Sequence, residues 1–145
     1  MRIEELLTGK TTCVLMKGSV ILKSEYSGIR PMLEWLGENR DLAGFSVADR
    51  IVGKAAAMLF VKAKLASVYA DVLSVPGKAY LEAHGIPFAY GTLTERIINR
   101  KGNGLCPMEQ TVLNMDDAEE GYLALKAKSE ELYWASEKTN DDHSH

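Results

Sequence analysis

Short apolar runs, separated by glycine, proline and charged residues, make up most of the chain. Residues 11–16 and 20–24 are β-branched and apolar, and Lys17-Gly18-Ser19 lies between them. β-Branched residues favour strands, and a short glycine-containing break favours a tight turn. The pattern predicts a β-hairpin, preceded by a helical turn at residues 3–7.

The next apolar segments have helical spacing. Pro31 stands at the front of residues 28–37, whose apolar positions Ile29, Leu33 and Leu36 share one helical face. Residues 42–49 lead into residues 51–61, which are rich in alanine and apolar on nearly every side. This composition is typical of an interior helix. We therefore expect a short helix ending near Gly37, and a buried one at 51–61.

Strand and helix patterns then alternate. Residues 66–74 predict a strand, residues 76–85 a helix that begins at a proline and ends at a glycine, and residues 86–91 a further strand. This order implies parallel pairing through right-handed crossovers. Pro107 starts another short helix, and the apolar spacing between residues 117 and 137 predicts an amphipathic C-terminal helix.

Composition limits the class of protein. The chain has 145 residues, of which 46% are hydrophobic and 26% charged, so we expect one domain at 1–137 and a polar, disordered tail at 138–145. The formal net charge of -3 argues against DNA binding. Apolar runs are too short for a membrane span, the acidic start does not fit a signal peptide, and the cysteines are widely separated. We expect a cytoplasmic protein with reduced thiols.

Lys54 and Asp49 are the first candidate binding residues. Lys54 begins the predicted buried helix, where the helix dipole attracts anions, so it could bind an anionic ligand or instead pair with a carboxylate such as Asp49. Asp49 could cap that helix together with Ser46, or it could orient Lys54 and a ligand hydroxyl. Both residues are predicted to bind a ligand.

A second candidate site follows the strand at 66–74. Ser74, Gly77 and Lys78 lie between this strand and the next helix, where parallel sheets present backbone amides to ligands. Arg96 begins a basic, glycine-containing segment that extends to Gly104 and also includes Arg100 and Lys101. This segment could close over a phosphate or remain a solvated loop.

Cys106-Pro107-Met108-Glu109 is the most unusual local run. A thiol at a helix start has its thiolate favoured by the dipole, so Cys106 is a candidate nucleophile and Glu109 a candidate acid or base. The alternatives are a small buried hydrophobe at Cys106, and a Glu109 that bonds free amides at a helix start.

Two segments resemble a known family. Residues 49–57, with the run 106–109, are similar to an uncharacterised, mostly bacterial family of domains of unknown function in the cytidine-deaminase-like superfamily. The resemblance covers residues 6–125 and implies a three-layer α/β/α fold with a mixed sheet. It also implies self-association into a homo-oligomer.

Zinc deaminases of this superfamily bind metal through a His-Ala-Glu or Cys-Ala-Glu motif and a Pro-Cys-x-x-Cys motif. The resemblance maps these motifs onto residues 53–56 and 74–79, which contain neither the ligands nor the proton-shuttling glutamate. Zinc-dependent deamination is therefore not expected, and no metal site is predicted.

Three functions remain open. The first is a binding protein for a nucleotide or another phosphorylated small molecule, which requires no cofactor and forms no contact with a membrane. The second is a metal-independent enzyme that uses Cys106 as nucleophile or covalent attachment point, with Glu109 handling protons. The third is a non-catalytic assembly or regulatory module.

Overall fold

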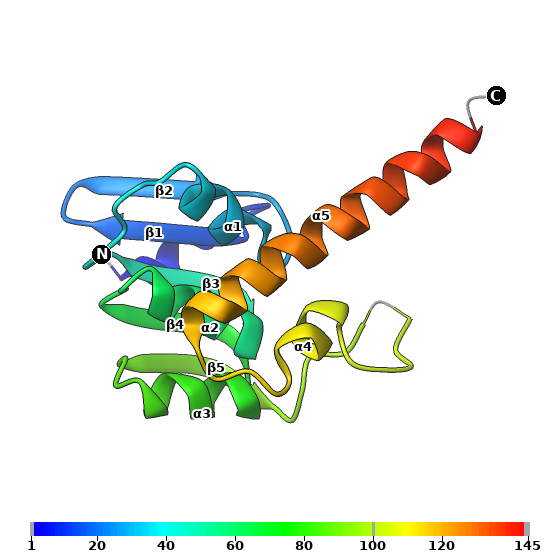
Figure 1. Ribbon diagram of the computed structural model, residues 1–145. Helices are drawn as coiled ribbons and strands as arrows, with labels where there is room; N and C mark the ends of the chain where they lie inside the picture. The colour runs from blue at the N-terminus through cyan, green and yellow to red at the C-terminus, as the bar shows by residue number, and fades with distance from the viewer. Residues whose placement is uncertain (1, 100, 144–145) are drawn as a thin grey trace.

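The computed structural model describes residues 2–99 and 101–143, with side chains as far as residue 132. Its centre is a five-stranded mixed sheet with the strand order β2-β1-β3-β4-β5 (Figure 1). β1 pairs antiparallel with β2 and β3, whereas β3, β4 and β5 are parallel to one another. The strands are β1 (Cys13–Lys17), β2 (Val20–Ser24), β3 (Ser46–Val52), β4 (Ser67–Ser74) and β5 (Phe88–Thr94).

The strands and helices follow one another largely in the predicted order. The predicted hairpin is confirmed, as is the parallel pairing of the later strands. The helical elements are the 3-10 helix η1 (Ile3–Leu6), α1 (Arg30–Gly37), α2 (Lys54–Lys62), α3 (Val75–Ala83), α4 (Pro107–Val112) and α5 (Ala118–His143).

β3 is the strand that the sequence pattern did not separate from the helix after it. The prediction placed a helix at 51–61, but β3 continues to Val52 and α2 starts at Lys54. Asp49 therefore lies inside a strand, and its predicted role as a helix cap is wrong. The physical reason is that β3 ends in the apolar pair Ile51-Val52 and α2 continues with apolar residues from Ala55, so the apolar run crosses the boundary between the two elements.

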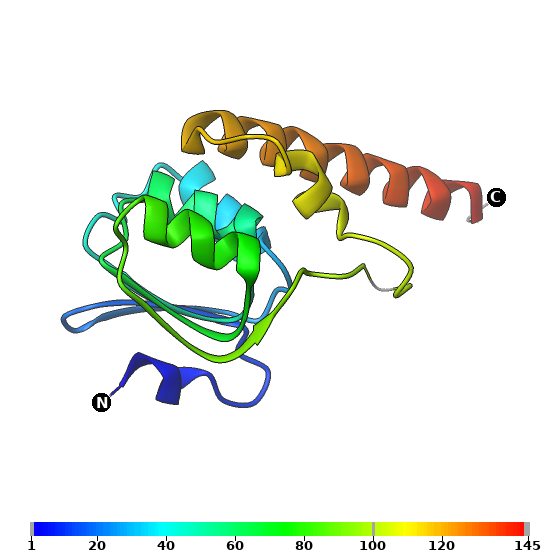
Figure 2. The ribbon, with the colours of Figure 1, turned by 90° about the horizontal axis from the view of Figure 1, so that it is seen from below.

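The two faces of the sheet are covered unequally (Figure 2). α1, α2 and α3 lie over one face, and α5 packs outside α2. On the other face η1 contacts β1 and β3 over a small cluster that includes Leu7, Val14 and Ala48. The expected three-layer arrangement is thus a helical layer, the sheet and, on the second face, a single short 3-10 helix.

α2 forms the centre of the main core. Its residues 55–60 are all buried, in agreement with the predicted interior helix. The start of α5 lies so close to α2 that a Cβ at Gly121 would stand 2.5 Å from Cε of Met58. α2 is therefore held between the sheet and α5.

α5 extends well beyond the rest of the molecule (Figure 1). It runs through residues 138–143 of the predicted polar tail, and residues 144–145 lie outside the described part. Lysine and glutamate, which are good helix formers, recur along residues 118–143. Within the described residues, no helix is both long enough and apolar enough to cross a bilayer.

Candidate functional site

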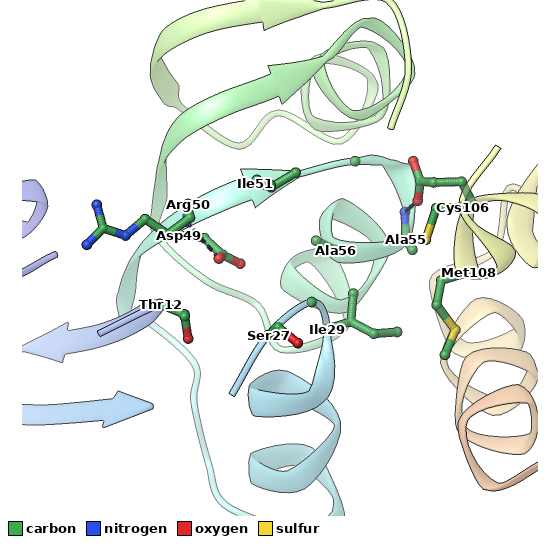
Figure 3. Close-up of a pocket in the computed structure, with 13 residues that line it drawn as sticks. Thr12, Ser27, Ile29, Asp49, Arg50, Ile51, Ala55, Ala56, Cys106 and Met108 are labelled. Carbon is green, nitrogen blue, oxygen red and sulfur yellow. Dashed lines mark hydrogen bonds between the residues drawn. The ribbon is translucent and has the colours of Figure 1, made fainter. Parts of the chain in front are cut away.

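A pocket with a volume of about 260 Å³ lies at the carboxyl end of β3 (Figure 3). It is enclosed by Thr12 just before β1, the turn before α1, the end of β3, the first turn of α2, and α4. Most of its surface is apolar. The lining residues are Thr12, Ser27, Gly28, Ile29, Asp49, Arg50, Ile51, Gly53, Ala55, Ala56, Cys106, Met108 and Glu109.

The place of the pocket in the sheet is informative. β3 has an antiparallel neighbour, β1, on one side and a parallel neighbour, β4, on the other. In open α/β sheets, ligands bind outside the carboxyl ends of the strands where the connections change direction. The pocket opens at such an end, so its position is typical of a ligand site.

Asp49 supplies the acidic end of the pocket. Its residue is 6% exposed, and one carboxylate oxygen, Oδ1, accepts a hydrogen bond of 2.8 Å from the backbone N–H of Arg50. Burial raises the pKa of Asp49 to about 8, against the opposing effect of backbone N–H groups, with a further upward contribution from the charge of Asp71. Asp49 is therefore largely protonated at neutral pH.

The neighbouring arginine does not neutralise Asp49. The Arg50 guanidinium points to the other side of the strand, where Nη1 lies 3.1 Å from Oδ2 of Asp71 and Nε donates to the carbonyl of Thr11 at 3.1 Å. Among the ion pairs of the described residues, none includes Asp49. The carboxyl thus lines the pocket without a basic partner.

Glu109 lines the same pocket, but both of its carboxylate oxygens already accept hydrogen bonds. Its Oε1 accepts the N–H of Lys54 and its Oε2 the N–H of Ala55, both at 2.8 Å. These are free amides at the start of α2, so Glu109 caps a helix 55 residues away in sequence. Burial raises the pKa of Glu109, and the two amides and the charge of Lys54 oppose that rise.

Gly53 makes room for this cap. A Cβ at residue 53 would stand 2.2 Å from Oε1 of Glu109 and 2.9 Å from Cγ1 of Ile97. Its backbone φ of -107° is ordinary, so the requirement for glycine is one of space. The start of α2, where an anionic ligand was expected to bind Lys54, is already occupied by the Glu109 carboxylate.

Lys54 points away from the pocket. Its Nζ donates to the backbone carbonyl of Leu113 at 3.2 Å, beyond the last turn of α4. It forms no ion pair with Asp49 among the contacts of the described residues. The expected pairing of these residues is therefore absent from the described contacts.

The predicted loop at 74–78 also lies outside the pocket lining. The Ser74 hydroxyl caps α3 by accepting the N–H of Gly77 at 3.0 Å. Gly77 allows α3 to approach α2, because a Cβ there would lie 2.9 Å from the carbonyl carbon of Gly53. Lys78 is half-buried on α3, and Arg96 is exposed after β5.

Cys106 lies at the opposite end of the pocket from Asp49, with Ala56 between them (Figure 3). Its residue is half-buried and occupies the N-cap position of α4, whose backbone runs on to Met108 and Glu109. The basic segment before it forms a turn in which Asn99 N–H donates to the carbonyl of Gly104. Arg100 lies outside the described residues.

The structure brings three of the predicted site residues together: Asp49, Cys106 and Glu109. It also adds pocket residues from the segment just before β1 and from the turn before α1, among them Thr12, Ser27 and Ile29. They carry no sequence motif, and they meet only because β1 pairs with β3. Gly28-Ile29 before Pro31 was a signal for a helix start, although not for a site.

Metal-ligating side chains do not gather in groups of three or more in the part of the chain that the structure describes. The polar side chains of the pocket are instead two carboxyls, two hydroxyls, one thiol and Arg50, whose guanidinium is directed to Asp71. This set of groups suits hydrogen bonding to an organic molecule.

Comparisons with known proteins place the chain in a family. The family model described as TM1506, domain of unknown function (DUF1893), matches residues 2–129. A crystal structure of a DUF1893 family protein (TM1506) from Thermotoga maritima is similar, with 32% identity, a TM-score of 0.75, and coverage of 81% of this chain and 80% of that one. No curated protein matches the chain. The chain therefore belongs to the DUF1893 family of domains of unknown function.

Proposed function

We propose that this protein binds a small organic molecule, without covalent chemistry, in the pocket at the end of β3. The observation that carries the proposal is the buried carboxyl of Asp49 at one end of a mostly apolar pocket. Binding pockets are commonly apolar with a few polar groups that orient the ligand. An isolated carboxyl costs stability in the absence of a partner, so its presence is best explained by an occupant.

Of the expected nucleotide or phosphorylated metabolite, only the part without the phosphate suits this pocket. A planar base or another compact ring is of a size that the pocket accommodates. A phosphate would meet no free basic group inside, since the lining Arg50 directs its guanidinium to Asp71, and Lys54, Lys78 and Arg96 are absent from the lining. In a phosphorylated ligand, the phosphate would therefore extend out of the pocket.

The deaminase-like scaffold is part of the same proposal. It is supported by the closeness of residues 53–56 and 74–79, onto which the resemblance maps the zinc motifs, because Gly53 and Gly77 are in near contact. In place of a metal, the Glu109 carboxylate binds the first amides of α2. A cytoplasmic location is also part of this proposal, and it rests on the wide separation of Cys13 and Cys106 in the sequence.

The test fills the pocket without touching Asp49. Ala56 lies on the pocket wall and is 4% exposed, so Ala56→Met places a larger side chain inside it. Ala79→Met, at an exposed position of α3, is the matched control. We expect native mass spectrometry, and ligand-detected NMR with a library of small ring compounds, to show ligands on wild type and Ala79→Met but not on Ala56→Met.

A second blocking variant protects this test against misfolding. Ser27 is exposed at the pocket wall, so Ser27→Tyr is expected to obstruct the entrance with little effect on folding. Equal binding by wild type and both blocked variants would overturn the proposal. Absence of binding, combined with a size that increases with concentration, would instead favour the assembly module.

An enzyme that uses Cys106 is the second candidate. The observation in its favour is that Cys106 lines the pocket that we propose for the ligand. Glu109 is poorly placed to transfer protons, since both of its oxygens accept backbone amides. This candidate predicts that Cys106 is alkylated faster than a thiol in a short peptide, and that ligand protects it; slow alkylation with or without ligand would eliminate it.

A further inference from the structure

The charge of the pocket restricts the class of ligand. Two carboxyl groups, those of Asp49 and Glu109, line it, and the guanidinium of the lining Arg50 is directed toward Asp71. Glu109 has its two amide donors at the start of α2. Asp49 has only backbone donors, the N–H of Arg50 at 2.8 Å from Oδ1 and the N–H of Ile51, and it forms no ion pair within the described residues. The pocket is therefore left with an acidic group that has no basic side chain beside it.

The direction of the Asp49 side chain makes this acidity available. Figure 3 shows its carboxyl group pointing from β3 into the pocket, toward the side where Ser27 and Ala56 lie. The Thr12 hydroxyl is within hydrogen-bond distance of the carbonyls of Ser24 and Tyr26, at 3.0 and 2.5 Å, and is thereby occupied outside the pocket. No other polar side chain is seen to compete for the Asp49 carboxyl from the described lining.

We propose that the ligand presents a cationic nitrogen group, an amidinium, guanidinium or ammonium, to the Asp49 carboxylate, while an apolar body fills the rest of the pocket. This inference rests on the proposed function and names its ligand class. The body would contact Ile29, Ile51 and Ala56 on the walls and Met108 near the far end. Charge-assisted hydrogen bonds to a carboxylate are strongest with such donors, and strengthen further away from water.

Binding of a cation is coupled to release of a proton. Because burial raises the pKa of Asp49 to about 8, the carboxyl must ionise before it pairs with a cation at neutral pH. Affinity is then expected to rise with pH up to about 8 and to level above it. Two titratable groups lie on the strands next to Asp49. Cys13 on β1 has a pKa that is raised by burial and by the charge of Asp49, and Asp71 on β4 is paired with Arg50. Cys106 and Glu109 lie farther along the pocket.

The experiment uses a matched set of ring compounds. Benzamidine carries the cation, benzamide is its neutral counterpart of the same shape, and benzoate is the anion. Calorimetry with the full chain in two buffers of different ionisation heat measures affinity and proton release. We expect benzamidine to bind wild type at least tenfold more tightly than benzamide and to release a proton below pH 8.

Asp49→Asn separates charge from shape. Asparagine keeps an acceptor for the Arg50 amide, so the pocket is expected to remain folded, as circular dichroism would verify. The variant should lose the preference for benzamidine and the proton release, while it still binds benzamide. An unchanged preference in Asp49→Asn would overturn the inference.

The failure of this inference and that of the proposed function have different signatures. If benzamide or benzoate binds as tightly as benzamidine and Ala56→Met abolishes that binding, the pocket binds ligands but does not prefer a cationic group. If none of the three compounds binds, or if their binding is unaffected by Ala56→Met and Ser27→Tyr, the pocket is not a ligand site for them and both proposals fail.

Discussion

The two buried carboxyls of the pocket, Asp49 and Glu109, have similar exposure and very different surroundings. Both are less than one tenth exposed. Glu109 accepts two backbone amides of α2, whereas Asp49 accepts the amide of its own neighbour Arg50 and forms no ion pair within the described residues. The difference teaches that burial alone does not identify a functional acid. The partners of each carboxyl separate a structural group from one that is left for a ligand.

The largest expected effect comes from the pH dependence of stability at Asp49. Its pKa in the folded protein is about 8, above the ordinary value of 3.8, so unfolding releases a proton between these values. The free energy of unfolding therefore falls as pH rises from about 4 to 8, by up to roughly 1.4 kcal/mol per pH unit, and levels above pH 8. Asp49→Asn should remove this part of the slope.

The measurement is urea denaturation of wild type and Asp49→Asn between pH 5 and pH 9. Glu109 and Cys13 also have raised pKa values, so only the difference between the two proteins reports on Asp49. Asp116→Asn, at an exposed aspartate, should leave the slope of wild type unchanged. A constant difference between wild type and Asp49→Asn across this pH range would show that Asp49 is ionised in the folded protein.

The second largest effect is expected on the stability of Glu109 variants, because Glu109 is the carboxyl with a structural role. Glu109→Ala leaves the amides of Lys54 and Ala55 without their acceptor, and we expect it to lower the free energy of unfolding by about 2–4 kcal/mol. Glu109→Gln keeps one acceptor oxygen and should lose about half as much. Chemical denaturation at pH 7 measures both, with Glu82→Ala, an exposed glutamate on α3, as the control.

This result would also separate capping from catalysis. If Glu109 acts on a substrate, Glu109→Ala should leave stability close to that of the Glu82→Ala control. A stability loss of the expected size, which Glu109→Gln partly restores, identifies the carboxylate as the cap of α2.

A smaller effect is expected from the residue that makes room for this cap. Gly53→Ala inserts a Cβ only 2.2 Å from Oε1 of Glu109, and overpacking of this kind costs about 1–3 kcal/mol. Gly37→Ala, in a helical position with no atom within 4 Å of the added Cβ, should be neutral. In a double-mutant cycle with Glu109→Ala, the cost of Gly53→Ala should shrink, because the clashing oxygen is gone. Additive costs would place the strain elsewhere.

Sequence patterns were sufficient for most of the fold. The hairpin, α1, the parallel strands and α3 follow from local apolar spacing and from Gly18 and the prolines at helix starts, because each signal lies within its own segment. β3 was missed since it joins α2 through Gly53 alone, with no change in apolar character across the boundary. Local pattern therefore fails where two buried elements follow each other directly.

The site was predicted less well for a related reason. Cys106 and Glu109 were identified from one unusual run, and Asp49 from its nearness to the helix start, and all three line the pocket. Their partners were not predictable, because Glu109 caps a helix 55 residues away and Arg50 turns to Asp71 on another strand. Hydrogen-bond partners across the fold depend on packing, which residue spacing does not encode.

The smallest effect is expected from Lys54→Ala, which tests whether the site binds an anion. The Lys54 ammonium reaches the carbonyl of Leu113, so Lys54→Ala should cost about 0.5 kcal/mol of stability. The affinity for benzamidine should stay within twofold of wild type, as it should in the control Lys78→Ala, since neither lysine lines the pocket. Calorimetry with benzamidine and with phenyl phosphate checks both. A loss of phenyl phosphate binding in Lys54→Ala alone would reverse the assignment of charge to the pocket, because it would require the lysine to leave Leu113 and bind the anion.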